Sequence, residues 1–184
     1  MANEKMEFKF YHADRMGHLS EGQAVNLCER GLSPFGRTYC DEIYRHKSTG
    51  AELNPTAYRE FMVEEIRAAN YDHFAVSRFQ CFFGANYIEE AIRFAKSILP
   101  IPEKPIPIFE VYASTYVTLD MNLIDTPHGD PEFVENIHRY WKRVISNSGP
   151  PSGNRRPPAL EVLMRLPVRI GKMVEIVEPT STSI

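Results

Sequence analysis

Glu161 is the residue whose type is least expected for its position in the sequence. It lies between Leu160 and Val162, at the start of a segment in which apolar residues alternate as a half-buried strand requires. A carboxylate there is costly unless it is solvated, paired or used. If it is used, it could stabilise a developing positive charge or take a proton from a nucleophile. If it is paired, its partner would be one of three nearby arginines, Arg155, Arg156 or Arg165.

Two further positions could do chemistry with such a carboxylate. His12 stands at the end of the alternating apolar face of "EFKFYHAD", where it could bind a ligand or lie at the core edge, hydrogen-bonded to backbone. Arg78 lies in "SRFQCFFG", among aromatic residues whose faces could stack on a flat ring or simply fill the core. Each residue therefore has one functional and one structural interpretation.

Several other chemistries lack their motifs. The chain has no phosphate-binding loop of the Walker or dinucleotide type and no G-x-S-x-G elbow of a serine hydrolase. Its six histidines show no metal-ligand spacing, and its three cysteines are odd in number and far apart. We therefore expect no metal site and free thiols.

The charge is unevenly distributed. The chain carries a net charge of −3, but residues 137–172 contain eight Lys or Arg and one acid, Glu161. Such a basic block indicates an anionic partner or ligand, although a solvated helix face with a charged loop would look the same. The overall acidity also differs from the strongly basic character of typical nucleic-acid-binding domains.

The elements that must position these residues alternate between strands and helices. We predict at most a short helix or strand in residues 15–53, and a final pair of strands, the Glu161 strand and 171–179, that could form a hairpin. The pattern favours a single α+β domain over residues 1–178 with a mixed or largely antiparallel sheet, followed by a flexible tail at 179–184. The other predicted elements are strands at 7–14, 74–84 and 108–125 and helices at 54–70, 86–99 and 130–146.

The start of the chain has no apolar signal-peptide core, and no apolar run approaches the roughly 18 residues of a membrane span. We therefore expect a cytoplasmic protein with no membrane partner.

Two segments resemble a known family. "FYHADRMGHLSEGQ" resembles the first strand of ADP-ribosyltransferases of the His…Glu type, and "RRPPALEVLMRLPVRIGKMVEIV" is similar to the closing segment of the DarT-like toxins of that superfamily. "DMNLIDTPHGDPEFVENIHRYW" is also similar to that group. The resemblance implies a split, largely antiparallel sheet with flanking helices. It also implies NAD as co-substrate, and a bacterial toxin or phage-defence effector that modifies nucleic acid and is neutralised by an antitoxin protein.

The resemblance also implies roles for individual residues. Glu161 would be the catalytic glutamate on a late strand, and His12 the first-strand histidine that holds NAD, so both should line one cleft. Arg143, Arg155 and Arg156 would bind the acceptor. Further contacts to NAD would come from Tyr11 and from one or more of Arg78, Phe83 and Tyr87, among which the sequence does not decide.

The chemistry of NAD cleavage suits one carboxylate. Breaking the bond between ribose and nicotinamide builds positive charge on the sugar, as in glycoside hydrolysis, and a nearby carboxylate stabilises it. Nicotinamide leaves without a general acid, and no metal is needed. Two alternatives stay open: an NAD glycohydrolase that uses water as acceptor, and a non-catalytic α+β module that docks a polyanion.

Overall fold

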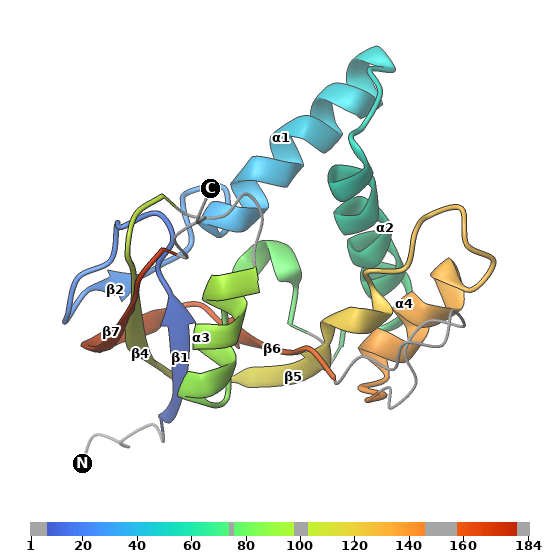
Figure 1. Cartoon of the computed structure of the whole chain (residues 1–184). Helices are drawn as coiled ribbons and strands as arrows, with labels where there is room; N and C mark the ends of the chain where they lie inside the picture. Colours follow the sequence, from blue (N-terminus) through green and yellow to red (C-terminus); the bar gives the residue numbers. More distant parts are fainter. Residues whose placement is uncertain (1–6, 74–75, 98–102, 146–157, 180–184) are drawn as a thin grey trace.

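The structure, a computed structural model, describes residues 7–73, 76–97, 103–145 and 158–179. Within these residues the strands form two sheets, and every strand pair is antiparallel. Helices flank the sheets on the outside (Figure 1). The predicted α+β class with a largely antiparallel core is therefore confirmed.

The larger sheet has four strands in the order β1-β4-β7-β2. Its first strand, β1, carries His12, and pairs with β4 along its whole length, from Phe8 opposite Ala113 to Ala13 opposite Ile108. The strands are β1 (Phe8–Ala13), β4 (Ile106–Ala113), β7 (Val168–Val177) and the short β2 (Ala24–Val25).

The smaller sheet has three strands in the order β3-β6-β5 and carries Glu161 on its central strand. The strands are β3 (Cys81–Gly84), β6 (Leu160–Arg165) and β5 (Tyr116–Asp120). An isolated bridge joins the two sheets: Tyr11 and Ala85 exchange backbone hydrogen bonds of 3.0 and 2.8 Å. A Cβ on the neighbouring Gly84 would lie 2.9 Å from the Tyr11 carbonyl oxygen, so only glycine allows this close approach.

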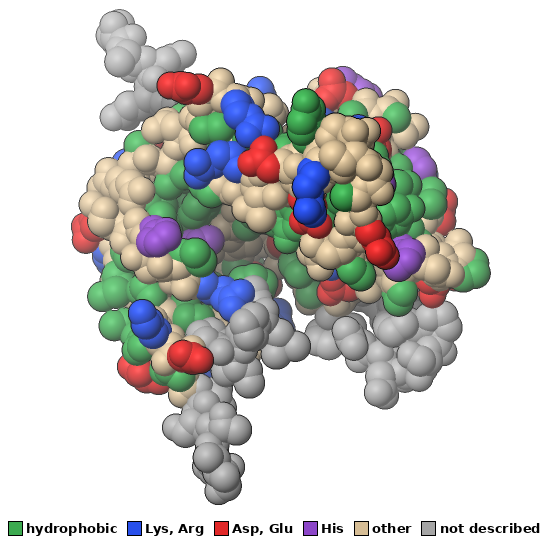
Figure 2. Space-filling view, turned by 90° about the horizontal axis from the view of Figure 1, so that it is seen from above, with side chains coloured by type: hydrophobic (Ala, Val, Ile, Leu, Met, Phe, Trp, Pro, Cys, Tyr) green, Lys and Arg blue, Asp and Glu red, His purple; other side chains and the backbone are tan. Residues whose placement is uncertain are grey.

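Four helices and two short 3-10 turns complete the described fold. The helices are α1 (Pro34–Thr49), α2 (Pro55–Asn70), α3 (Ile88–Ser97) and α4 (Phe133–Trp141), and the turns are η1 (Arg78–Gln80) and η2 (Met121–Leu123). Helices α2 and α4 lie beside the smaller sheet, whereas α1 projects from the body of the molecule (Figure 1). Seen from the side from which α1 projects, the surface is hollowed near its centre (Figure 2).

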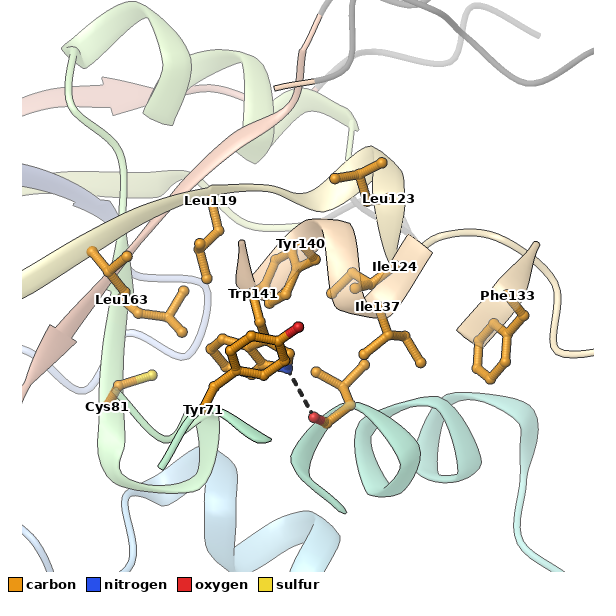
Figure 3. Packing of buried hydrophobic residues seen from close by; sticks show 12 residues of the cluster. Tyr71, Cys81, Leu119, Leu123, Ile124, Phe133, Ile137, Tyr140, Trp141 and Leu163 are labelled. Carbon is orange, nitrogen blue, oxygen red and sulfur yellow. Dashed lines mark hydrogen bonds between the residues drawn. The ribbon is translucent and has the colours of Figure 1, made fainter. Parts of the chain in front are cut away.

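Three apolar clusters hold these layers together. The largest packs one face of the smaller sheet against α2 and α4, and includes Tyr140, Trp141 and Leu163 (Figure 3). The second fills the space between the sheets and includes Phe10, Phe109 and Met164. The third lies under α3. Because burying apolar area is the main stabilising term in folding, these clusters fix the orientation of the strands that carry the candidate residues.

Several helix predictions hold and one fails. Helix α2 begins as predicted, with Asn54 as its N-cap accepting the Ala57 N–H and with Pro55 in the first turn. Helix α4 ends at Trp141, earlier than predicted, and Arg143 nearby has a positive φ of 61°. The prediction of at most a short element in residues 15–53 is wrong, because α1 has 16 residues.

The predicted hairpin between the last two strands is also wrong. Strand β6 pairs with β3 and β5, whereas β7 pairs with β4 and β2 in the other sheet. Arg78 and Phe83 were expected on one strand, but Arg78 lies in η1 and only Phe83 lies in β3. Among the described helices, none is both long and apolar enough to cross a membrane. The three cysteines, all in described segments, are free as predicted.

Candidate functional site around Glu161

The second residue of β6 is Glu161, and its side chain points into the largest apolar cluster. It pairs across the sheet with Leu119 of β5, and Leu163 follows two positions later on the same face. Both leucines belong to the cluster that packs against α2 and α4. Only 6% of Glu161 is exposed, so its carboxylate lies where it must be hydrogen-bonded or paired.

Arg78 is the ion-pair partner of Glu161. Its Nη1 lies 2.5 Å from Glu161 Oε1, and only 4% of the arginine is exposed. The hydroxyl of Tyr140, on α4, donates to the same Oε1 at 2.6 Å and accepts from Arg78 Nη1 at 2.6 Å. The ion pair that the sequence suggested with Arg165 is therefore wrong, and the other two arginines it offered, Arg155 and Arg156, lie outside the described residues.

A second carboxylate binds the other side of the Arg78 guanidinium. Glu60 of α2, which is buried, accepts from Arg78 Nε at 2.8 Å and from Nη2 at 3.3 Å. Arg59 lies 3.1 Å from Glu60 and 2.8 Å from Asp125, which is more exposed. The sign of the charge therefore alternates along a row that begins at the buried Glu161 and ends at the more exposed Asp125. The row is Glu161, Arg78, Glu60, Arg59 and Asp125.

Turn η1 presents Arg78 to both acids. Ser77 is its N-cap, and Glu64 of α2 accepts from the Ser77 hydroxyl at 2.7 Å and from the Arg78 backbone N–H at 3.3 Å. Helix α1 packs closely on the next residue, because a Cβ on Gly36 would overlap the Phe79 carbonyl group. The backbone around Arg78 is thus held from two helices.

Half-buried aromatic rings lie against the guanidinium of Arg78. Its Cζ lies 4.9 Å from the ring centroid of Phe83 and 5.6 Å from that of Phe35. These two rings meet edge to face with centroids 4.7 Å apart, and Tyr39 packs on Phe35 at 4.7 Å. All three aromatic residues are half-buried, so they reach from the charged cluster toward the surface. The rings offer apolar faces beside a buried arginine.

Opposing effects set the protonation of this cluster. Burial raises the pKa of Glu161, while the charge of Arg78 and the hydrogen bond from Tyr140 act in the other direction. Burial acts to lower the pKa of Arg78, but Glu161 and Glu60 outweigh it and raise that pKa well above its ordinary value. Burial likewise raises the pKa of Tyr140, so its hydroxyl keeps its proton.

The two oxygens of Glu161 differ. Oε1 accepts from both Arg78 and Tyr140, whereas Oε2 accepts no hydrogen bond from the described residues. In the described part of the chain, the one fully buried side-chain N or O atom without a partner is Arg59 Nε. Among the described residues, the two donors to Glu161 therefore both meet Oε1.

The prediction that His12 and Glu161 line one cleft is wrong. Phe83 pairs with Leu163 and so shares the face of Glu161, whereas the side chain of Phe82 points to the other face of β3. The ring of His12 packs on Phe82, with centroids 4.4 Å apart. His12 therefore lies on the opposite side of the smaller sheet, next to the cluster between the two sheets.

Of the two ring nitrogens of His12, Nδ1 has a hydrogen-bond partner among the described residues and Nε2 has none. Its Nδ1 lies 2.7 Å from the Phe83 carbonyl oxygen, which can only accept, so Nδ1 carries a proton. Burial lowers the pKa of His12, which favours the neutral ring. Nε2 is then an acceptor, and no described residue donates to it. The structural interpretation of His12, a core-edge histidine bonded to backbone, matches this geometry.

The remaining predicted contacts to NAD lie away from Glu161. Tyr11 forms the bridge between the sheets and packs in the cluster under α3. Tyr87 precedes α3 and is 65% exposed. Of the predicted acceptor residues, Arg143 is exposed just after α4, while Arg155 and Arg156 are outside the described residues. Of the predicted site residues, the structure thus brings Arg78 and Phe83 to Glu161.

Three residues of this cluster were not predicted from the sequence: Glu60, Tyr140 and Arg59. All three lie on predicted helices, where a single acidic, aromatic or basic residue has no unusual neighbours. A usable signal for Glu60 is its position three residues after the core position Ala57 and three before Val63, on the apolar face of α2. In the described residues no group of three or more His, Cys, Asp or Glu side chains could hold a metal ion.

One family model matches most of this chain. No curated protein matches the sequence. The model of a family described as "Protein of unknown function (DUF2441)" matches residues 41–175, more than two thirds of the 184 residues. The matched segment contains Glu60, Arg78, Tyr140 and Glu161 but not His12. The chain therefore belongs to the DUF2441 family.

Proposed function

We propose that this chain is an NAD-dependent ADP-ribosyltransferase in which Glu161 is the catalytic carboxylate. The observation that carries the proposal is the unequal bonding of that carboxylate. Arg78 and Tyr140 fix Oε1, while Oε2 has no donor among the described residues. A carboxylate that two donors hold by one oxygen is preorganised, which suits it to stabilise charge that develops in a transition state.

The proposed reaction begins with cleavage of the bond between C1′ of the ribose and the nicotinamide nitrogen. Nicotinamide leaves with the bonding electron pair, and the sugar becomes an oxocarbenium-like cation. Glu161 stabilises this cation through Oε2 and accepts the proton that the acceptor loses as it bonds to C1′. The pKa of Glu161, raised by burial, suits a carboxylate for this role as a base.

The neighbouring residues support a flat ligand with a charged reaction centre. Phe83 and Phe35 are half-buried and lie beside Arg78, so a planar ring could stack on them next to Glu161. Arg78 already makes four hydrogen bonds inside the cluster. We therefore assign Arg78 to holding Glu161 and not, as the sequence suggested, to binding NAD. His12 is not part of the proposed site.

We further propose that the acceptor is nucleic acid. The support is the excess of cations in residues 137–172, since contacts to phosphates supply much of the affinity for nucleic acid. Arg143 is the predicted acceptor residue that the structure describes, and it is exposed. A role as a bacterial toxin or phage-defence effector, neutralised by an antitoxin protein, rests on the sequence resemblance alone.

A second candidate is a non-catalytic α+β module that docks a polyanion. It is favoured by one observation: Arg59, Glu60, Arg78 and Glu161 compensate one another, as the members of a purely structural ion-pair network would. Such a network needs no NAD. The two candidates therefore differ in whether NAD is consumed.

The test is incubation of the purified chain with NAD labelled in its adenine ring. Separate reactions contain DNA, RNA, a protein pool or no acceptor, and both nicotinamide release and acceptor labelling are measured. We expect nicotinamide release together with label on DNA or RNA. Release without labelled acceptor would indicate an NAD glycohydrolase, and no release in any reaction would favour the non-catalytic module.

A further inference from the structure

The hydroxyl of Tyr140 closes a triangle with Arg78 and Glu161. Arg78 Nη1 has two N–H groups, which point to the Tyr140 oxygen at 2.6 Å and to Glu161 Oε1 at 2.5 Å. The Tyr140 hydroxyl lies 2.6 Å from the same Oε1, and an ionised carboxylate can only accept, so the hydroxyl donates. Arg78 thus fixes the direction in which Tyr140 donates.

The ring of Tyr140 has little freedom to move its hydroxyl. The residue is fully buried and lies edge to face with Trp141, with centroids 4.9 Å apart. Trp141 Nε1 donates to the Val63 carbonyl oxygen at 3.0 Å, which ties α4 to α2 (Figure 3). Packing of α4 therefore places the hydroxyl, and the hydroxyl in turn places one oxygen of Glu161.

The groups that face Glu161 come from each element packed around it. Arg78 of η1 and Tyr140 of α4 contact it, and Glu60 of α2 lies behind Arg78. Cys81 of β3 is also near, and burial raises the pKa of its thiol well above the ordinary value, so it stays uncharged. Of these groups, Tyr140 is the one neutral donor to the carboxylate, so it can be removed without changing the charge of the cluster.

We infer that Tyr140 is a positioning residue for Glu161: its hydroxyl holds Oε1 and leaves Oε2 as the atom that meets the ligand. Because the hydrogen bond is made to the ionised carboxylate, it also favours that form. This inference rests on the proposed function for its link to catalysis. Tyr140 does not itself touch the reacting atoms, because its hydroxyl is on the Oε1 side of the carboxylate. Its effect on the reaction passes through Glu161.

The test compares Tyr140→Phe with Tyr71→Phe. Tyr71 is a matched control, because it is a buried tyrosine of the same apolar cluster whose hydroxyl meets His138 at 3.0 Å. In Tyr140→Phe we expect kcat for nicotinamide release to fall about tenfold on the acid side of the pH profile, the scale of one hydrogen bond to a charged group. The loss should shrink as pH rises, and KM for NAD should change little. If Tyr140 had a purely structural role, the acid limb of the pH profile, the range in which kcat falls as pH falls, would stay at the same pH in Tyr140→Phe.

A second readout does not depend on turnover. The infrared band of the protonated Glu161 carboxyl group, identified by its absence in Glu161→Gln, titrates with a midpoint that we expect to rise in Tyr140→Phe and not in Tyr71→Phe. An unchanged midpoint in folded Tyr140→Phe overturns the inference. If NAD is not cleaved but the midpoint still rises, the proposed function fails while the control of Glu161 by Tyr140 stands.

If Tyr140→Phe does not fold, a third variant tests the same inference. Site-specific replacement of Tyr140 by 3-fluorotyrosine preserves the ring and the hydroxyl but makes the phenol a stronger hydrogen-bond donor. The midpoint of the Glu161 infrared titration and the acid limb of the kcat profile should then both move to lower pH. If neither of them moves in this folded variant, the inference is also overturned.

Discussion

Arg78 Nη1 lies 2.5 Å from Glu161 Oε1, although the two residues are 83 positions apart in the chain. The same guanidinium contacts Glu60 through Nε at 2.8 Å. One buried cation thus stands between two buried carboxylates that come from a helix and from the centre of a sheet. This arrangement answers why a glutamate interrupts the apolar strand β6: its charge is compensated from η1.

Replacing Arg78 by Met should be strongly destabilising. The change leaves Glu60 and Glu161 buried without the cation between them, and breaking a buried pair in this way costs about 3–5 kcal/mol. Urea unfolding, followed by the fluorescence of the single tryptophan, Trp141, measures the loss. Arg169→Met is the control, because Arg169 pairs with Glu7 at the exposed surface and should shift the midpoint little. Equal small shifts in both variants would show that the buried network does not stabilise the fold.

The pH dependence of stability should reveal the state of Glu161. Its pKa is raised by burial, so its contribution to stability is fully present below the ordinary glutamate pKa and is lost as pH rises through the folded-state pKa. The stability of the natural chain relative to Glu161→Gln should therefore be greatest at the acid end and decline toward neutral pH. A relative stability that grows with pH would mean that the pKa of Glu161 is lowered instead.

Glu110 should show the opposite sign. Burial acts to raise its pKa, but hydrogen bonds from Tyr112 and Lys9 outweigh this effect and the pKa is lowered. Its contribution is present above the ordinary glutamate pKa and is lost as pH falls through the folded-state value. The same series of unfolding experiments on Glu110→Gln should give a stability difference that decreases on acidification. Parallel curves for the two variants would contradict the assigned environments.

Adding a methyl group at Gly36 should disturb the candidate site from outside it. A Cβ there would overlap the backbone carbonyl of Phe79, the residue after Arg78, so α1 and η1 must move apart. We expect Gly36→Ala to lose about 1–3 kcal/mol of stability, as overpacked sites do. The matched variant Gly129→Ala meets nothing within 4 Å and should melt close to the natural chain. Thermal melting of both proteins is the check, and equal melting temperatures would show that the contact is not tight.

Two features that depend only on residues close together in the sequence were predicted correctly. The start of α2 follows from Asn54 and Pro55, and the alternation around Glu161 predicts β6, because caps and side-chain periodicity are local effects. Helix α1 was missed because residues 15–53 are rich in glycine, which outweighed the helical spacing of Phe35, Tyr39 and Ile43. One of these glycines, Gly36, is explained by a contact with Phe79 that no local pattern contains.

The candidate site depends on pairings between distant segments. Strand periodicity shows that Glu161 lies on one face of β6, but not which face of β3 His12 will meet, so their placement on opposite sides could not be predicted. The meeting of Glu60, Arg78 and Glu161 is set by how α2, η1 and the smaller sheet pack together. A single sequence contains no spacing signal for such a meeting.

The nucleic-acid part of the proposal makes a prediction about salt. Arg143 is exposed just after α4, and if it contacts a phosphate, Arg143→Ala should weaken binding to nucleic acid and flatten its dependence on salt concentration. Filter binding across a salt series measures both effects. Arg93→Ala, which removes an exposed arginine from α3 on another element, is the control. If the two variants bind alike, Arg143 is a solvated surface residue.

The central claim is tested most directly by nicotinamide release from NAD in three proteins: the natural chain, Glu161→Gln and Glu175→Gln. Glutamine keeps the size of Glu161 but removes the charge that would stabilise the oxocarbenium, and Glu175 is an exposed glutamate of β7 that serves as the control. We predict release by the natural chain and by Glu175→Gln, and a rate lower by a factor of about 100 or more in folded Glu161→Gln, the scale of losing one preorganised electrostatic group. Release by Glu161→Gln at the natural rate, or no release by the natural chain, would contradict the assignment of Glu161 as the catalytic carboxylate.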